Sequence, residues 1–148
     1  MPDAGHKPLS ILIVEDNKDA AQTLALLLGM AGYEVQAAGD GPSAAHAVQD
    51  RPPEVILMDL TLPGEDGYTV AKRLRGFLPQ KPLLLAMTGL GEEGDRQRSL
   101  EEGFDDHIVK PVDPPRLLDM LRAYAAARDS RESGNDPGTG VAQENPNR

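Results

Sequence analysis

The chain has 148 residues, a length that suits one domain with a hydrophobic core. A formal net charge of −9 and an aromatic content of 3% argue against direct nucleic acid binding, because the chain offers neither a basic surface nor a platform for stacking bases. The absence of cysteine excludes disulfides and thiolate metal sites, and no apolar stretch reaches the roughly 20 residues of a membrane span, so we expect a cytoplasmic protein with no membrane partner.

Short apolar runs alternate with amphipathic stretches along most of the chain. This alternation predicts five βα units, the pattern of a parallel sheet with helices on both faces. The runs are short and apolar throughout, as is typical of strands that are buried on both sides. The predicted strands are residues 11–14, 34–38, 54–58, 82–87 and 104–109.

Capping residues and breakers mark where the predicted helices begin and end. Asn17 and Asp66 are expected N-caps, and the sequence at residues 41–43 favours a third helix start. A fourth helix over residues 92–102 carries few large apolar side chains, so we expect it to be weakly anchored. The last helix is expected to start at residue 113 or 114.

The two ends of the chain differ in composition from the part between them. Residues 129–148 are rich in Ser, Gly, Asn and Pro, and they offer too little apolar surface to offset the entropy of ordering them. We therefore expect a flexible leader over residues 1–7, one domain over residues 8–128 and a disordered tail over residues 129–148.

The predicted strands end at polar side chains. Glu15 and Asp16 follow the first strand, Asp59 follows the third, Thr88 the fourth and Lys110 the fifth. In a parallel sheet these ends meet at one edge, which is where ligands bind. Three carboxylates there require a cation, and a ligand set made only of oxygens favours Mg²⁺.

This cluster has the groups that phosphoryl transfer needs. A carboxylate beside Mg²⁺ can attack a phosphoryl group, while an ammonium and a hydroxyl hold its oxygens. Asp59, Lys110 and Thr88 supply these three groups in that order. The alternative for Lys110 is a surface lysine without a role, but its place between an apolar strand and Pro111 favours the functional interpretation.

Four segments together resemble the receiver domain of bacterial two-component response regulators. They are residues 13–17 (IVEDN), 58–67 (MDLTLPGEDG), 86–89 (AMTG) and 103–111 (GFDDHIVKP). Each motif alone is weak, but their combined spacing is highly specific, and the resemblance covers about residues 8 to 127. It implies a flavodoxin-like, doubly wound five-stranded parallel sheet with strand order 2-1-3-4-5 and five helices.

The resemblance implies a phosphoacceptor and a set of metal ligands. Asp59 would receive a phosphoryl group from a phosphohistidine of a sensor histidine kinase or a histidine phosphotransfer protein. Asp16 would bind Mg²⁺ directly, and Glu15 would bind it directly or through water. The backbone carbonyl of Thr61 would be a further ligand.

The resemblance also implies residues that respond to the phosphoryl group. Thr88 and Lys110 would contact it, and the bond from Lys110 to Pro111 resembles the cis peptide of the family. The family's aromatic switch position is His107 here, a residue able to change charge near neutral pH. We hypothesise that His107 couples output to pH, which an unchanged pH dependence of partner binding in His107→Phe would refute; the alternative is a partly exposed strand histidine without a role.

The implied function is a phosphorylation-controlled switch that catalyses only its own phosphoryl transfer and autodephosphorylation. Its output would be a downstream protein or a second copy of the chain, bound at the face of the fourth helix, fifth strand and fifth helix.

One alternative is a receiver that binds partners without phosphorylation. A Mg²⁺-dependent phosphatase of the haloacid dehalogenase kind is disfavoured, because that class needs a second acid where Thr61 stands. Whether the chain is free-standing or belongs to a hybrid kinase stays open.

Overall fold

The computed structural model describes residues 7–89 and 93–132 of the chain. These residues fall into two compact units, one of residues 7–113 and one that begins at Pro114. The predicted leader up to residue 6 and the predicted tail beyond residue 132 lie outside the described residues. No helix in the described part of the chain combines the length and the hydrophobicity that a membrane span needs.

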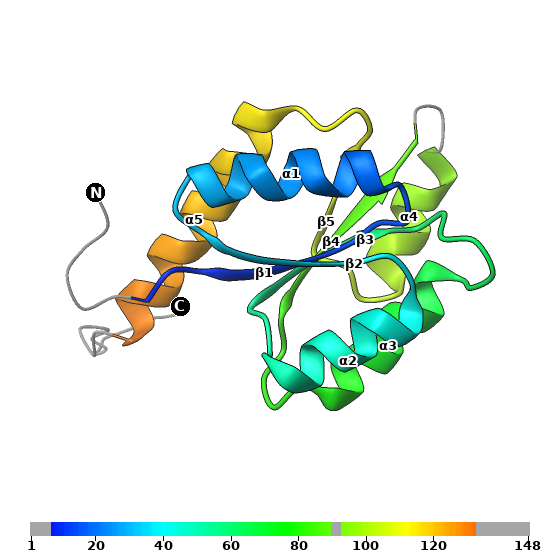
Figure 1. Cartoon of the computed structure of the whole chain (residues 1–148), viewed down its shortest axis with the longest axis horizontal. Helices are drawn as coiled ribbons and strands as arrows, with labels where there is room; N and C mark the ends of the chain where they lie inside the picture. Colours follow the sequence, from blue (N-terminus) through cyan, green and yellow to red (C-terminus); the bar gives the residue numbers. More distant parts are fainter. Residues whose placement is uncertain (1–6, 90–92, 133–148) are drawn as a thin grey trace, which may run out of the picture. The chain divides into compact units, whose positions relative to one another are not determined.

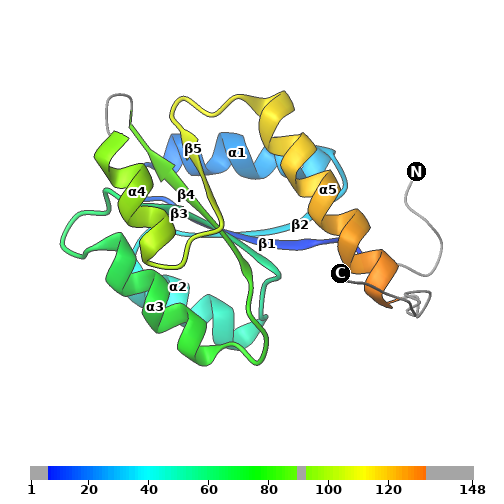
Figure 2. The same cartoon turned by 180° about the vertical axis from the view of Figure 1, so that it is seen from behind.

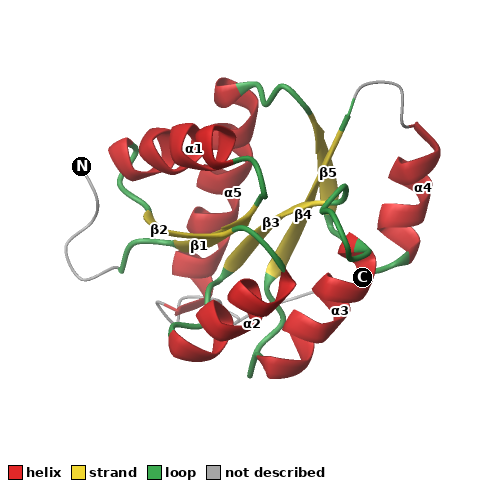
Figure 3. Cartoon of the chain, turned by 45° about the vertical axis from the view of Figure 1, so that its right-hand side comes forward, coloured by secondary structure: helices red, strands yellow, loops and turns green. Residues whose placement is uncertain are grey.

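The larger unit contains a parallel sheet with the strand order β2-β1-β3-β4-β5, as predicted (Figure 1). Its strands lie between red helices in Figure 3. The strands are β1 (Ser10–Val14), β2 (Glu34–Ala38), β3 (Val55–Asp59), β4 (Leu83–Thr88) and β5 (Asp106–Val109). The helices of this unit are α1 (Lys18–Met30), α2 (Gly41–Asp50), α3 (Gly67–Phe77) and α4 (Glu93–Glu101).

Helices cover both faces of the sheet, with α1 on one face and α2 and α3 on the other (Figure 1). Because side chains alternate along a strand, each buried strand supplies both cores. Leu12 and Ile56 belong to the cluster that α2 and α3 complete with residues such as Val48 and Leu74. All five residues of β3 are buried, which fits its place at the centre of the sheet.

Local capping explains where three helices start. The Asn17 Oδ1 atom accepts a hydrogen bond from the backbone N–H of Ala20 at 3.0 Å, and Asp66 Oδ1 accepts one from Tyr68 at 3.2 Å. Both caps were predicted. Asp40 caps α2 in the same way, because its Oδ1 atom accepts a hydrogen bond from Ser43 at 2.8 Å. These bonds satisfy backbone donors that the first turn of a helix leaves unpaired.

The smaller unit consists of α5 (Pro114–Glu132), which continues four residues past the predicted boundary at residue 128. The prediction averaged the composition of residues 129–148, but the first Gly of that segment is Gly134, so nothing in residues 129–132 breaks a helix. An ion pair between Arg128 and Asp129, at 2.8 Å, lies at the predicted boundary.

The fifth strand is shorter than predicted, and the fourth helix is close to its predicted bounds. β5 begins at Asp106, and the buried Phe104 precedes it. Leu84 donates its backbone N–H to the side chain of Asp105 at 2.8 Å, so a side chain takes a position that a strand carbonyl would otherwise hold. Residue 92, the predicted first residue of α4, lies outside the described residues.

Candidate functional site

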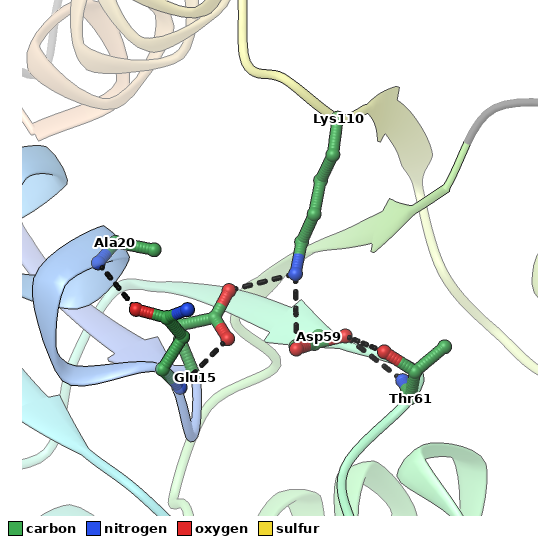
Figure 4. Close-up of polar contacts among 6 residues, drawn as sticks. Glu15, Ala20, Asp59, Thr61 and Lys110 are labelled. Atoms are coloured by element: carbon green, nitrogen blue, oxygen red, sulfur yellow. Dashed lines mark hydrogen bonds and ion pairs between the residues drawn. The ribbon is translucent and has the colours of Figure 1, made fainter.

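Glu15, Asp59 and Lys110 of the predicted site come together at the carboxyl ends of the strands (Figure 4). Asp59 is the last residue of β3, and Glu15 directly follows β1, its neighbour in the sheet. Thr88 ends β4, and Lys110 directly follows β5. The parallel sheet therefore places these side chains at one edge, although the chain separates them by up to 95 positions.

Lys110 joins the two buried carboxylates of the site. Its ammonium donates hydrogen bonds to Glu15 Oε1 at 2.7 Å and to Asp59 Oδ2 at 3.0 Å (Figure 4). Glu15 is 5% exposed and Asp59 is 1% exposed, so neither charge would be tolerated there without a cationic partner. The backbone N–H of Lys110 donates to the Thr88 carbonyl at 2.7 Å, and the Lys110–Pro111 peptide is cis, as the resemblance implied.

The second oxygen of Asp59 is held by Thr61. Asp59 Oδ1 accepts one hydrogen bond from the Thr61 backbone N–H at 2.8 Å and another from the Thr61 hydroxyl at 2.7 Å (Figure 4). The sequence analysis gave Thr61 a role only through its backbone carbonyl and missed this hydroxyl contact. The signal was present, because Asp followed two residues later by Thr is the pattern of a local turn closed by the Asp side chain.

The start of α1 holds Glu15 in the same manner. Glu15 Oε2 accepts a hydrogen bond from the backbone N–H of Asn17 at 3.0 Å, while the Asn17 side chain caps the helix. Both oxygens of Glu15 are thus fixed, one by Asn17 and one by Lys110. The neighbouring Asp16 is exposed. The site therefore has two oriented, buried carboxylates and one that faces solvent.

Three carboxylates of the site suit a divalent metal ion. Glu15, Asp16 and Asp59 each offer one oxygen, and these oxygens all lie within 4.8 Å of one another. A donor set of carboxylate oxygens without sulfur or imidazole suits a hard cation such as Mg²⁺, which binds through one or two carboxylates and keeps several waters. Burial of two of the three carboxylates strengthens the case, because a cation would offset their mutual repulsion.

The surroundings shift the pKa values of the three charged groups Glu15, Asp59 and Lys110 in different directions. Burial raises the pKa of Glu15, and its hydrogen bonds from Lys110 and Asn17 only partly offset this. Burial also opposes ionisation of Asp59, but the two hydrogen bonds from Thr61 and the one from Lys110 outweigh it, so the pKa of Asp59 lies below its usual range. Burial disfavours the charge on Lys110, yet the two carboxylates raise the pKa of that ammonium. Asp59 is therefore an ionised carboxylate at neutral pH.

Glu15→Gln is expected to stabilise the metal-free protein at neutral pH. A carboxyl whose folded pKa lies above its ordinary value of 4.5 contributes stability below that pH and loses it as the pH rises through the folded pKa. Gln does not titrate, so the gain in free energy of unfolding over wild type should grow as the pH rises from 4.5 toward neutrality. Urea unfolding in a chelating buffer at several pH values measures this difference. A difference that shrinks with rising pH would contradict it.

Thr88 and His107 lie in neighbouring strands. Thr88 is the last residue of β4 and is 1% exposed. His107 lies opposite Ala86 in the β4–β5 pair and is 8% exposed. The interpretation of His107 as a partly exposed strand residue is therefore wrong, because its side chain is buried. Its coupling of output to pH stays a prediction.

Comparison with known proteins identifies relatives over most of the chain. The family described as response regulator receiver domain matches residues 11–122. A sensory transduction protein, RegX3, from Mycolicibacterium smegmatis is 37% identical over 130 residues, which cover 87% of this chain and 56% of that protein. A phosphate regulon transcriptional regulatory protein, PhoB, from Pseudomonas aeruginosa is 39% identical over 115 residues, which cover 77% of this chain and 50% of that protein. The chain thus spans about half the length of these curated relatives.

Solved structures of single receiver domains match more completely. A CheY-like response regulator receiver domain from Methylobacillus flagellatus is 30% identical with a TM-score of 0.72, and the match covers 79% of this chain and 98% of that one. The receiver domain of a sensor histidine kinase from Pseudomonas aeruginosa, solved with a magnesium ion in its active site cleft, is 29% identical with a TM-score of 0.71 over 81% of this chain and 99% of that one. By sequence and by fold, this chain belongs to the response regulator receiver domain family.

Proposed function

We propose that this receiver domain is phosphorylated on Asp59 by a phosphohistidine, with Mg²⁺, and acts as a conformational switch for a partner protein. Receiver domains are signalling phosphoacceptors of two-component systems, and they interact with histidine kinases or phosphotransfer proteins. The observation that carries the proposal is the state of Asp59: a buried carboxylate with a lowered pKa, next to the Lys110 ammonium at 3.0 Å. That state favours a nucleophile that is ionised before its donor arrives.

The proposed step transfers one phosphoryl group between two side chains. A carboxylate oxygen of Asp59 attacks phosphorus, the bond from phosphorus to the donor imidazole nitrogen breaks, and that nitrogen keeps the electron pair. Lys110 is placed to hold a phosphoryl oxygen, and the buried hydroxyl of Thr88 is a second candidate donor. Mg²⁺, when held by Glu15, Asp16, Asp59 and the backbone carbonyl of Thr61, would neutralise charge on the phosphoryl oxygens.

The proposed donor is a sensor histidine kinase or a histidine phosphotransfer protein, and the proposed output is protein contact. We assign the output to α4 and β5 of the larger unit and to α5 of the smaller one, with a downstream protein or a second copy of the chain as the partner. A net charge of −9 supports a protein partner over nucleic acid for this chain itself. RegX3 and PhoB are described as a sensory transduction protein and a transcriptional regulatory protein, which favours gene regulation as the purpose of the pathway.

The two alternative functions receive less support. A phosphorylation-independent receiver would not need a complete site, yet Glu15, Asp16, Asp59 and Lys110 are all present, and Lys110 contacts both Glu15 and Asp59. A phosphatase with an aspartyl nucleophile needs a second acid two residues after it. Thr61 holds that position, and its hydroxyl donates to the nucleophile instead of acting as an acid.

Phosphorylation by a small donor tests the proposal. The protein is incubated with acetyl phosphate in Mg²⁺ or in EDTA, and borohydride then reduces any aspartyl phosphate to homoserine, which peptide mass spectrometry locates. We expect modification at Asp59 in Mg²⁺ and none in EDTA, because the carboxylate cluster needs a divalent ion to accept further negative charge. Modification at another carboxylate, or no modification in Mg²⁺, would overturn the proposal.

A further inference from the structure

The first turn of α3 holds α4 through a small cluster of side chains. The hydroxyls of Tyr68 and Ser99 are hydrogen-bonded at 3.3 Å, and the Arg98 guanidinium carbon lies 4.1 Å from the centre of the Tyr68 ring. Arg98 also lies 3.4 Å from the Asp66 carboxylate. We call Asp66, Tyr68, Arg98 and Ser99 the Tyr68 latch. Figure 2 shows α4 next to the start of α3.

Tyr68 also contacts the segment that leads from α4 into β5. Phe104 meets the Tyr68 ring edge to face, with ring centres 5.9 Å apart and planes at 88°. The Phe104 backbone N–H donates to the Ser99 carbonyl at 2.9 Å. One buried tyrosine therefore contacts the last turn of α4 and Phe104, three residues beyond the end of that helix.

Among the described side chains of α4, the one that is buried belongs to the latch. Over residues 97–101, Ser99 is the one buried side chain, at 0% exposure, whereas Leu100 is 52% exposed. A helix that buries a serine and exposes its leucine gains little from the hydrophobic effect. Among the described side chains of α4, the polar and aromatic contacts to Tyr68 are therefore the main contribution to its position.

The other end of the latch lies against the phosphoacceptor. A Cβ atom on Gly67, the first residue of α3, would come within 3.1 Å of the Asp59 carbonyl and 2.9 Å of the Leu60 Cα atom. The loop between them is held at both ends, because Thr61 donates twice to Asp59 and Asp66 caps α3. A shift of Thr61 would thus move the backbone that carries Tyr68.

The loop is also braced against a third helix. Glu65 forms an ion pair with Arg73 at 3.0 Å, and the Glu65 carboxyl lies so close to Gly41, at the start of α2, that a side chain at Gly41 would collide with it. A loop fixed at Thr61, Glu65 and Asp66 has little freedom to absorb a displacement locally. A movement at Asp59 would therefore be passed on toward Tyr68.

We propose that the Tyr68 latch couples modification of Asp59 to the position of α4. Unmodified Asp59 holds Thr61 and keeps α4 fastened to α3; a phosphoryl group competes for the two Thr61 donors, moves the loop and loosens the latch. This inference rests on the proposed function and adds a route through α3 that uses neither Thr88 nor His107. Coupling is reciprocal, so weakening the latch must favour a phosphoryl group at Asp59.

Beryllium trifluoride, which mimics a phosphoryl group on a carboxylate, tests the coupling as a reversible ligand. Tyr68→Phe removes the hydroxyl and keeps the ring, and Ser99→Ala removes the other half of the bond. With Mg²⁺ present, we expect each variant to bind beryllium trifluoride about 5-fold more tightly than wild type. We also expect faster amide hydrogen exchange over residues 97–101 in each variant, and in wild type when the ligand is bound. Thr23→Ala, which removes an exposed hydroxyl from α1, should behave as wild type in both measurements.

The outcomes separate the latch from the proposed function. Faster amide hydrogen exchange in the variants, with an unchanged affinity for beryllium trifluoride, would show that Tyr68 only supports α4. That result would overturn the coupling. Ser99→Ala keeps the question decidable if Tyr68→Phe does not fold. If wild type does not bind beryllium trifluoride at Asp59, both the proposed function and the latch are overturned. If wild type binds it and both variants bind it with the same affinity as wild type, only the latch is overturned.

Discussion

Asp59→Asn is expected to abolish phosphorylation by acetyl phosphate while leaving the fold intact. The amide oxygen can still accept the two hydrogen bonds from Thr61, and Lys110 keeps its bond to Glu15, so the site retains most of its contacts. An amide is not a nucleophile, so the rate at which the protein incorporates phosphate should fall by at least about 10³-fold, as when a catalytic nucleophile is removed. Intact-protein mass spectrometry over a time course in Mg²⁺ measures the loss.

Asp50→Asn is the matched control for this variant. Asp50 is an exposed residue at the end of α2 and undergoes the same chemical change without touching the site. It should be phosphorylated at the wild-type rate. If Asp59→Asn accepted phosphate as fast as Asp50→Asn, a different carboxylate would be the acceptor, and the assignment of Asp59 would be wrong.

The juxtaposition of the charged residues was predictable because it depends on topology alone. Parallel strands end at one edge, so any polar side chain that directly follows a strand lies there. Glu15, Asp59 and Lys110 each follow an apolar run, and no knowledge of side-chain packing was needed to bring them together. Helix starts were predictable for a similar reason, since an N-cap such as Asn17 acts within one turn.

The contacts of Tyr68 could not be predicted in the same way. They join the first turn of α3 to the last turn of α4, and they depend on the path of two loops and on side-chain rotamers. The sequence of α4 shows no apolar stripe, so it predicted weak anchoring but not what replaces the stripe. Periodicity detects apolar faces, and it has no signal for a buried hydroxyl pair.

Burial of His107 is a third case, because one of the two interpretations of this residue took it to be partly exposed. β5 is an edge strand, and edge strands are often half exposed. Ile108 beside it is 3% exposed, however, and His107 itself is 8% exposed, so both successive side chains of this strand are covered. Burial is confined to the middle of the strand, because Val109 at its end is 40% exposed.

Lys110 has a structural role as well as the proposed catalytic one, and this makes its replacement informative. It is the one cation within hydrogen-bonding distance of Glu15 and Asp59 among the described side chains. Both carboxylates are almost completely buried, whereas the lysine side chain is 31% exposed. The ammonium thus balances, from the rim of the site, charges that lie inside it.

Lys110→Met is expected to slow phosphorylation by acetyl phosphate about 100-fold, because one group that stabilises the transferring phosphoryl oxygens is lost. Without Mg²⁺, the variant should also be less stable than wild type by about 1–3 kcal/mol, since two buried carboxylates keep no ammonium partner. Saturating Mg²⁺ should recover most of this stability and little of the rate. Urea unfolding with and without Mg²⁺ measures the change in stability, and the rate of phosphorylation by acetyl phosphate in Mg²⁺ measures the change in reactivity.

Two further variants separate the two roles of this lysine. Lys81→Met, at an exposed position before β4, makes the same change away from the site and should match wild type in both measurements. Adding Glu15→Gln to Lys110→Met removes one of the two buried charges, so the metal-free stability should rise again while phosphorylation stays slow. Metal-free Lys110→Met as stable as wild type would mean that the buried carboxylates do not need the ammonium. Recovery of the rate in the double variant would mean that Lys110 acts on phosphorylation only by offsetting the charge of Glu15.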